Sequence, residues 1–345
     1  MGYNKWNMRH ILIALLSTTI FGGIWFADRY PDQTGYIIRT VIDGGVQLAA
    51  AIAHKPKTVA GLKSAYDRAE QNQEKIRILI VPGHEPDYGG TEFKKIIERD
   101  LNVVLADHLL GFMGQNKKYQ VFTTRTKEGW SPEFSDYFKN QWDSIVSWRA
   151  AIREQKTTMI AAGTHSRMEP AIKHNDIPRN VALRLHGINK WANENDIDIV
   201  IHIHFNDYPG HPKNIAGKHS GFAIYIPENQ YQNSTSTRAV AEAIFRRLEE
   251  HTPVSTLSGE SNGIIEDPDL IAIGADDSAN AASMLIEYGY IYEPQFADPV
   301  DRDPVLKDLA FQTYLGIKDF FDPSANARLY NDTSISPYIW SKPIQ

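Results

Sequence analysis

Short apolar runs alternate with longer segments of helical periodicity between residues 76 and 321. The short runs predict buried strands at Ile76–Val81, Tyr119–Thr124, Asp198–His204, Gly221–Pro227 and Met284–Glu287. Apolar positions at helical spacing predict helices at Glu92–Met113, Pro132–Glu154, Val181–Asn195, Thr237–Glu250 and Pro304–Phe321. Strands that alternate with helices predict an α/β fold with a mostly parallel twisted sheet flanked by helices.

The N-terminus has a different pattern and predicts a membrane-anchor helix ahead of the α/β domain. Lys5 and Arg9 precede an uncharged run from Ile11 to Ala27. This run is at the short limit of a membrane span, and Trp25 and Phe26 are unlike the small residues that signal peptidase requires. The pattern favours an uncleaved signal anchor over a cleaved signal peptide or a buried core helix. The positive-inside rule then places the remaining chain outside the cytoplasmic membrane, in the cell envelope.

These patterns divide the chain into an N-terminal anchor, a helical stalk, a main domain and an irregular tail, at residues 1–35, 36–75, 76–322 and 323–345. Within the main domain, residues 126–180 are longer than a simple connection requires. Loops of this length commonly form lids or docking elements.

Composition limits the chemistry that the main domain can perform. The chain has no cysteine, so disulfides and thiolate metal sites are excluded and a metal would be held by histidines and carboxylates. Its net charge is −6 and it has no Lys/Arg-rich stripe, which argues against a nucleic-acid partner. With 42% hydrophobic and 11% aromatic residues, a packed core is expected and global disorder is excluded.

Polar side chains stand at the carboxyl ends of three predicted strands, where ligands gather in open α/β sheets. They are His84, His204 and Glu287, and His202 points to the same face as His204 because it lies two residues earlier in an extended strand. Two imidazoles and one carboxylate, with an open position, form a recurrent catalytic zinc set. The spacing alone does not separate metal ligands from structural histidines.

Five stretches of this main domain resemble the zinc-dependent N-acetylmuramoyl-L-alanine amidases of bacterial cell walls. They are the Pro-Gly-His strand Ile78–His84, Glu98-Arg-Asp-Leu-Asn102, Val121-Phe-Thr-Thr-Arg125, the block from Arg184 to Asn206, and Leu285-Ile-Glu-Tyr-Gly-Tyr-Ile291. Each stretch is weak evidence by itself. Because all five occur in the family's order with plausible spacing, the resemblance as a whole is specific.

The resemblance implies that His84, Glu98 and His204 bind Zn²⁺, and it selects Glu98 rather than Glu92 as the carboxylate ligand. It also implies that Glu287 takes a proton from the attacking water and returns it to the leaving amine. The implied substrate is peptidoglycan, cut between N-acetylmuramic acid and L-alanine. In some relatives an inserted helix covers the zinc site until an activator protein removes it. The helix at residues 132–154 would be such a lid or a solvated accessory helix.

Glu85 and His202 depart from the family pattern. Glu85 replaces a glycine beside the first histidine and places an additional carboxylate near the site, while His202 stands where the family has serine. We expect His202 to contact substrate or to be a satisfied buried histidine rather than a fourth ligand. Arg125 is expected to pair with an acid in the core, the alternative being to hold a negative substrate group. Asn206 is expected to orient the loop after His204.

Three functions follow from these observations, in decreasing order of support. The first is a peptidoglycan amidase, and the second is a zinc hydrolase of the same fold that acts on another amide. The third is a non-catalytic binding or regulatory relative. Relatives of the third kind typically lose a ligand or the catalytic glutamate, whereas here all four positions are filled.

Overall fold

A six-stranded sheet forms the centre of the domain in the order β4-β1-β7-β10-β8-β9. The computed structural model describes residues 56–69, 74–174, 177–208 and 210–323. The strands are β1 (Ile76–Pro82), β4 (Tyr119–Thr123), β7 (Ile199–Asn206), β8 (Ala223–Pro227), β9 (Ile264–Asp267) and β10 (Ala282–Tyr290). Strands β4, β1, β7 and β10 are mutually parallel, while β8 runs antiparallel to β10 and pairs in parallel with β9. The mostly parallel sheet expected from the sequence is therefore confirmed.

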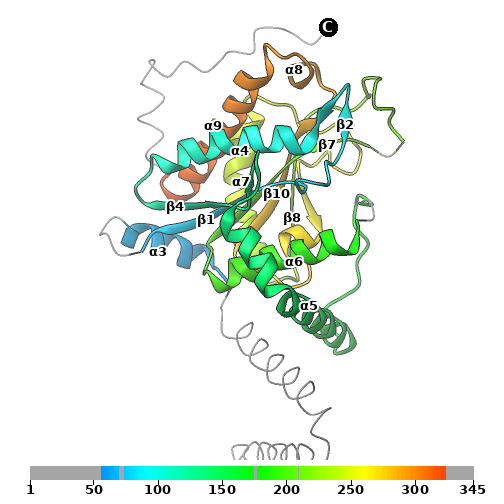
Figure 1. The fold of residues 1–345 in the computed structure, drawn as a ribbon. Helices are drawn as coiled ribbons and strands as arrows, with labels where there is room; N and C mark the ends of the chain where they lie inside the picture. The colour runs from blue at the N-terminus through cyan, green and yellow to red at the C-terminus, as the bar shows by residue number, and fades with distance from the viewer. Residues whose placement is uncertain (1–55, 70–73, 175–176, 209, 324–345) are drawn as a thin grey trace, which may run out of the picture. The chain divides into compact units, whose positions relative to one another are not determined.

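Helices cover both faces of this sheet (Figure 1). Helices α4 (Glu98–Gly114), α7 (Ser234–Glu249) and α9 (Arg302–Phe321) pack with one set of strand residues, including Ile78 and Ile201. Helices α5 (Pro132–Ala161) and α6 (Arg179–Glu194) pack on the other set, which includes Leu79 and Val200. The alternation of neighbouring residues between two buried faces explains why these strands are apolar almost throughout.

The described part of the expected stalk belongs to the core of this domain. Helix α3 (Val59–Ala69) buries Leu62 and Tyr66, and the Tyr66 ring stacks on Phe321 with centroids 4.5 Å apart. Its apolar residues recur at helical spacing because they face the domain. Residues 59–69 therefore pack as a domain helix, and the domain begins before the boundary at residue 76 that the sequence suggested.

The sequence predicted a single helix at Glu92–Met113, and this prediction is wrong for residues 92–97. Residues Glu92–Phe93 (β2) and Ile96–Ile97 (β3) form a short antiparallel hairpin, and α4 begins only at Glu98. Lys94 and Lys95 make the turn with φ values of 45° and 71°, which are incompatible with a right-handed helix. The hairpin places Glu98 at the start of the helix.

Several smaller elements were not expected from the sequence. They are strand β9, the hairpin strands β5 (Arg125–Thr126) and β6 (Gly129–Trp130), a 3₁₀ turn at Ile271–Ile273, and α8 (Pro294–Ala297). The expected anchor (1–35), residues 36–55 of the expected stalk and residues 324–345 of the tail lie outside the described residues. Among the described residues, no helix is long and apolar enough to cross a membrane.

Candidate active site

Three side chains that can ligate a metal converge at the carboxyl edge of the parallel strands. His84 follows β1, His204 lies near the end of β7, and Glu98 is the first residue of α4. His84 Nε2 is 2.7 Å from Glu98 Oε2, and His204 Nδ1 is 3.0 Å from Glu98 Oε1. One ligand atom from each residue lies within 4.8 Å of the other two. The structure thus brings together the three residues that the resemblance selected.

Backbone amides hold the Glu98 carboxylate in place. Thr91 N–H donates to Glu98 Oε2 at 3.0 Å, and Phe205 N–H donates to Oε1 at 3.2 Å. Burial disfavours the charged form, yet His84 and His204 outweigh it and lower the pKa of Glu98 below its ordinary value. Glu98 is therefore an ionised carboxylate with a fixed orientation, as a metal ligand would have to be.

Two glycines allow the backbone to approach these ligands closely. A Cβ atom on Gly83 would lie 2.3 Å from His204 Nε2, and one on Gly90 would lie 2.2 Å from His84 Nε2 and 2.4 Å from Glu98 Oε2. His84 itself has a φ of 66°, an uncommon conformation for a residue with a side chain. The loop between β1 and α4 is thus shaped around the ligand group, a feature that the strand-end pattern did not reveal.

Glu287 lies beside the ligand group on the adjacent strand. It pairs in register with His204 across β10 and β7, and its Oε2 is buried with no hydrogen-bond partner among the described residues. Burial and the negative charges of Glu98 and Glu260 raise the pKa of Glu287 well above its ordinary value. A carboxyl group whose pKa is raised holds a proton more readily than an ordinary glutamate, which suits a role in proton transfer.

Sequence reasoning missed Glu260, a buried carboxylate with several hydrogen-bond donors around it. Tyr225 Oη and Asn206 Nδ2 donate to its Oε1 at 2.6 and 2.7 Å, and Ser255 Oγ and Tyr290 Oη donate to its Oε2 at 2.5 and 3.0 Å. Asn206 is thus engaged with Glu260 rather than with the loop after His204. No motif marks Glu260, because it lies in an irregular loop and three of its four donors come from distant elements.

The Arg125 guanidinium holds the backbone around the site through four hydrogen bonds to carbonyl oxygens. Its Nε donates to the carbonyls of Pro82 at 3.1 Å and His84 at 2.9 Å, and its Nη2 donates to those of Gly83 at 2.5 Å and Arg99 at 2.9 Å. Burial lowers the pKa of Arg125 to about 10, so it remains charged at neutral pH. A structural role was expected, but its partners are carbonyl oxygens rather than an acid of the core.

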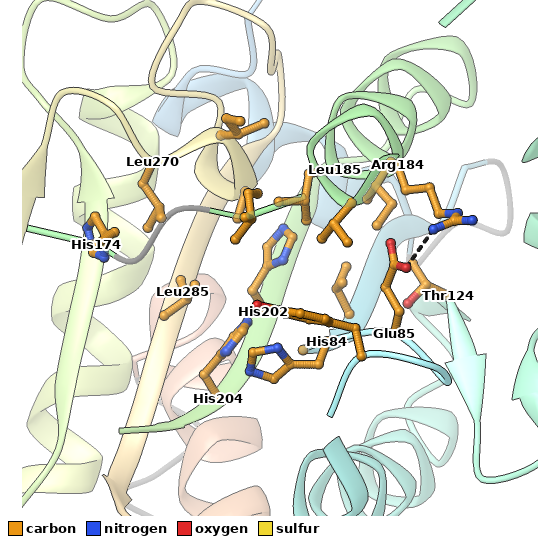
Figure 2. Close-up of a pocket in the computed structure, with 18 of the residues that line it drawn as sticks. His84, Glu85, Thr124, His174, Arg184, Leu185, His202, His204, Leu270 and Leu285 are labelled. Atoms are coloured by element: carbon orange, nitrogen blue, oxygen red, sulfur yellow. Dashed lines mark hydrogen bonds and ion pairs between the residues drawn. The ribbon is translucent and has the colours of Figure 1, made fainter. Parts of the chain in front are cut away.

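A pocket of about 650 Å³ opens from the ligand group between β7, α6 and the loop around Leu270 (Figure 2). His84, His202 and His204 contribute to its lining, as do apolar side chains such as Leu185 and Leu285. Both ring nitrogens of His202 are buried, and neither has a hydrogen-bond partner in the part of the chain that the structure describes. Burial and the nearby His204 lower the pKa of His202 to about 3, so the ring is neutral. His202 lies outside the three-residue ligand group, and its position in the lining is consistent with a substrate contact.

The insertion reaches this pocket through its C-terminal segment and not through its helix. No residue of α5 lines the pocket; this helix packs on α6 through Phe134 and Ile145. The wall instead includes Glu169, Pro170, Lys173, His174 and Ile177. The helix at residues 132–154 is thus not the element that covers the site in this structure.

The ligand group fits a zinc ion. Two imidazole nitrogens and a carboxylate oxygen, with a pocket beside them for a fourth ligand, form a catalytic zinc set. Burial, partly offset by Glu98, lowers the pKa of His204, so its ring is neutral as a ligand must be. Glu98 supplies the negative charge.

Comparison with known proteins places the chain in a family. A sequence model of the family described as N-acetylmuramoyl-L-alanine amidase matches residues 78–319, which is more than half of the chain. No curated protein matches the chain significantly.

Several solved structures resemble this one. The N-acetylmuramoyl-L-alanine amidase of Clostridium difficile 630 is 17% identical with a TM-score of 0.43, covering 73% of this chain and 100% of its own. The amidases Ami1 of Mycobacterium smegmatis and Mycobacterium abscessus are each 14% identical, with TM-scores of 0.46 and 0.47. These matches cover 73% and 72% of this chain and 99% and 100% of theirs. The family model covers all four residues singled out for chemistry, and the chain belongs to the N-acetylmuramoyl-L-alanine amidase family.

Proposed function

We propose that this protein is a zinc-dependent peptidoglycan amidase that hydrolyses the bond between N-acetylmuramic acid and L-alanine. His84, Glu98 and His204 would hold the zinc ion, and Glu287 would transfer the proton. The observation that carries the proposal is the convergence of these three ligands beside Glu287 at one edge of the sheet. Family membership supports the choice of substrate.

Each part of the site has a defined task in this reaction. A zinc ion bound there would lower the pKa of a water molecule and polarise the scissile carbonyl. Glu287 accepts the proton of the attacking water on its carboxylate and donates it to the nitrogen of the leaving L-alanine. Its raised pKa suits both steps, because a strongly acidic carboxylate would release its proton too readily to serve as the acid.

The experiment that tests this proposal is digestion of purified peptidoglycan with the soluble part of the chain. The native protein should release peptides that begin with a free L-alanine amino group, and Glu287→Ala should release almost none. Equal release by both proteins would exclude the proposed role of Glu287. Bound zinc without any release from peptidoglycan would favour a hydrolase of another amide, and a lack of bound zinc would favour a non-catalytic relative.

We also propose that the protein works in the cell envelope, held to the cytoplasmic membrane by its N-terminus. The support is the uncharged run from Ile11 to Ala27 and the basic residues before it. Replacing Leu15 and Leu16 by arginine should move the full-length protein from the membrane fraction to the soluble fraction. A double variant that stays in the membrane fraction would argue against this anchor.

Access to the pocket is proposed to be regulated by the wall segment between Glu169 and Ile177 and by an activator protein. His174 in this segment pairs with Asp267 at 2.7 Å, which holds the segment against the end of β9. His174→Ala should therefore increase peptidoglycan digestion by the isolated domain. Unchanged or reduced digestion would indicate that the segment is a fixed wall.

A further inference from the structure

An ion pair lies in the wall of the pocket beside the ligand group (Figure 2). Glu85 Oε2 is 2.6 Å from Arg184 Nη1, and both residues line the pocket. Glu85 is 7% exposed, and its Oε1 is buried with no hydrogen-bond partner among the described residues. Neither the metal site nor the proton transfer requires this pair.

The pair neutralises the cation that would otherwise be available to a substrate carboxylate. The guanidinium of Arg184 comes from α6 and faces Glu85, which follows His84 directly. Among the described residues of the lining, Lys173 is the only other lysine or arginine, and the acidic Glu169 and Asp269 share the same wall. A substrate carboxylate entering the pocket would thus find Arg184 already paired with Glu85, in a wall where three acidic side chains outnumber two basic ones.

A neutral amide group meets no such repulsion. Glu85 Oε1 has unused acceptor capacity, and a primary amide carries two N–H donors that can complete it after a small rotation of the side chain. Leaving this oxygen without a donor in a buried position is costly, so a substrate that supplies one is favoured. The same pocket therefore rejects a carboxylate and accepts its amide.

We propose that the Glu85–Arg184 pair selects stem peptides in which the carboxyl group next to L-alanine is amidated over those in which it is free. This inference rests on the proposed amidase function and adds a substrate class to it. The peptide chemistry involved is that of D-isoglutamine against D-glutamate as the second residue. The pocket would distinguish the two peptides by charge, because a carboxylate and its amide have nearly the same shape.

A matched pair of substrates tests the proposal directly. N-acetylmuramoyl-L-alanyl-D-isoglutamine and N-acetylmuramoyl-L-alanyl-D-glutamate differ only in the amidation of one carboxyl group. Native protein should cleave the amide with a kcat/KM at least about tenfold higher than the acid, since juxtaposed like charges strongly disfavour a ligand. Similar kcat/KM values for the two substrates would overturn the proposal whatever the variants show.

Three variants separate selection from a merely structural role. Glu85→Gln should reduce the preference by about tenfold, mainly by raising kcat/KM for the acid, since it removes the negative charge and leaves Arg184 free. Arg184→Gln should increase the preference, because Glu85 then acts as an unpaired carboxylate. Glu249→Gln, which removes an exposed negative charge on α7 outside the pocket lining, is the control and should change the ratio less than about twofold.

The outcomes distinguish this inference from the proposed function. Cleavage of neither substrate by native protein would overturn both. Cleavage of both substrates with equal efficiency would overturn the selection alone. Equal losses on both substrates in Glu85→Gln and Arg184→Gln would mean that the pair only supports the loop after His84.

Discussion

Replacing Gly90 by alanine should disrupt metal binding while leaving the fold intact. Gly90 has a φ of 72°, and a Cβ atom there would lie 2.2 Å from His84 Nε2 and 2.4 Å from Glu98 Oε2. Since real Cβ contacts are almost never shorter than 3.0 Å, the His84 ring must move by at least about 0.8 Å. Functional groups are held to within about 0.5 Å in working sites, so this displacement exceeds the tolerance.

Two effects add in this variant and can be separated. The left-handed backbone costs about 1–2 kcal/mol for a residue with a Cβ atom, and the displaced ligands should weaken zinc binding by at least about 10- to 100-fold. Gly163 has the same φ of 72° but has no atom within 4 Å of its would-be Cβ. Gly163→Ala thus reproduces the backbone strain without touching the ligands.

Zinc affinity by chelator competition and unfolding by denaturant are the measurements. Gly163→Ala should lose about 1–2 kcal/mol of unfolding free energy and keep native zinc affinity, whereas Gly90→Ala should lose zinc affinity and amidase activity. Equal zinc affinity in native protein and Gly90→Ala would refute the proposed ligand geometry.

Three further predictions follow from the site and its surroundings. Arg125→Met should lower the unfolding free energy by about 3 kcal/mol or more, because it removes four hydrogen bonds from a charged guanidinium to carbonyl oxygens; urea denaturation measures this, and a loss below about 1 kcal/mol would contradict the role of Arg125 in holding these carbonyls. Leu62→Ala should cost about 2–5 kcal/mol in the same assay because α3 is part of the core, whereas the exposed Asp67→Ala should be close to neutral. Glu260→Gln removes a negative charge that raises the pKa of Glu287, so Glu287 should ionise at lower pH and the acidic limb of the kcat/KM profile should move to lower pH; a shift to higher pH would contradict the coupling.

The sequence was sufficient to predict the centre of the fold and part of the site. Strands β1, β7 and β10 are buried on both faces, and their apolar runs are readable without any tertiary information. Because these strands are parallel, His84, His204 and Glu287 at or beyond their carboxyl ends meet at one edge. This geometry follows from strand order and direction.

Glu98 could not be found from hydrophobic spacing. It looks like an interior residue of a helix that starts at Glu92, because the hairpin of β2 and β3 has apolar residues that continue the helical pattern. Only the positive φ values of Lys94 and Lys95 end that pattern, and lysine gives no local signal for such a turn. The resemblance to a known family supplied what the spacing lacked.

Other features depend on contacts between distant segments. The four carbonyls bound by Arg125 and the four donors around Glu260 are brought together by the packed loops, so no local pattern announces them. The antiparallel direction of β8 against β10 is likewise not marked by any local pattern. Such features require the folded structure.

The central claim is that His84, Glu98 and His204 hold a single zinc ion next to Glu287. Anomalous diffraction from crystals of the zinc-loaded protein, collected on both sides of the zinc absorption edge, tests it most directly. We expect one strong anomalous peak between these three side chains and its loss in His204→Ala. A crystal with zinc bound elsewhere and no peak between these residues would show that they do not form the zinc site.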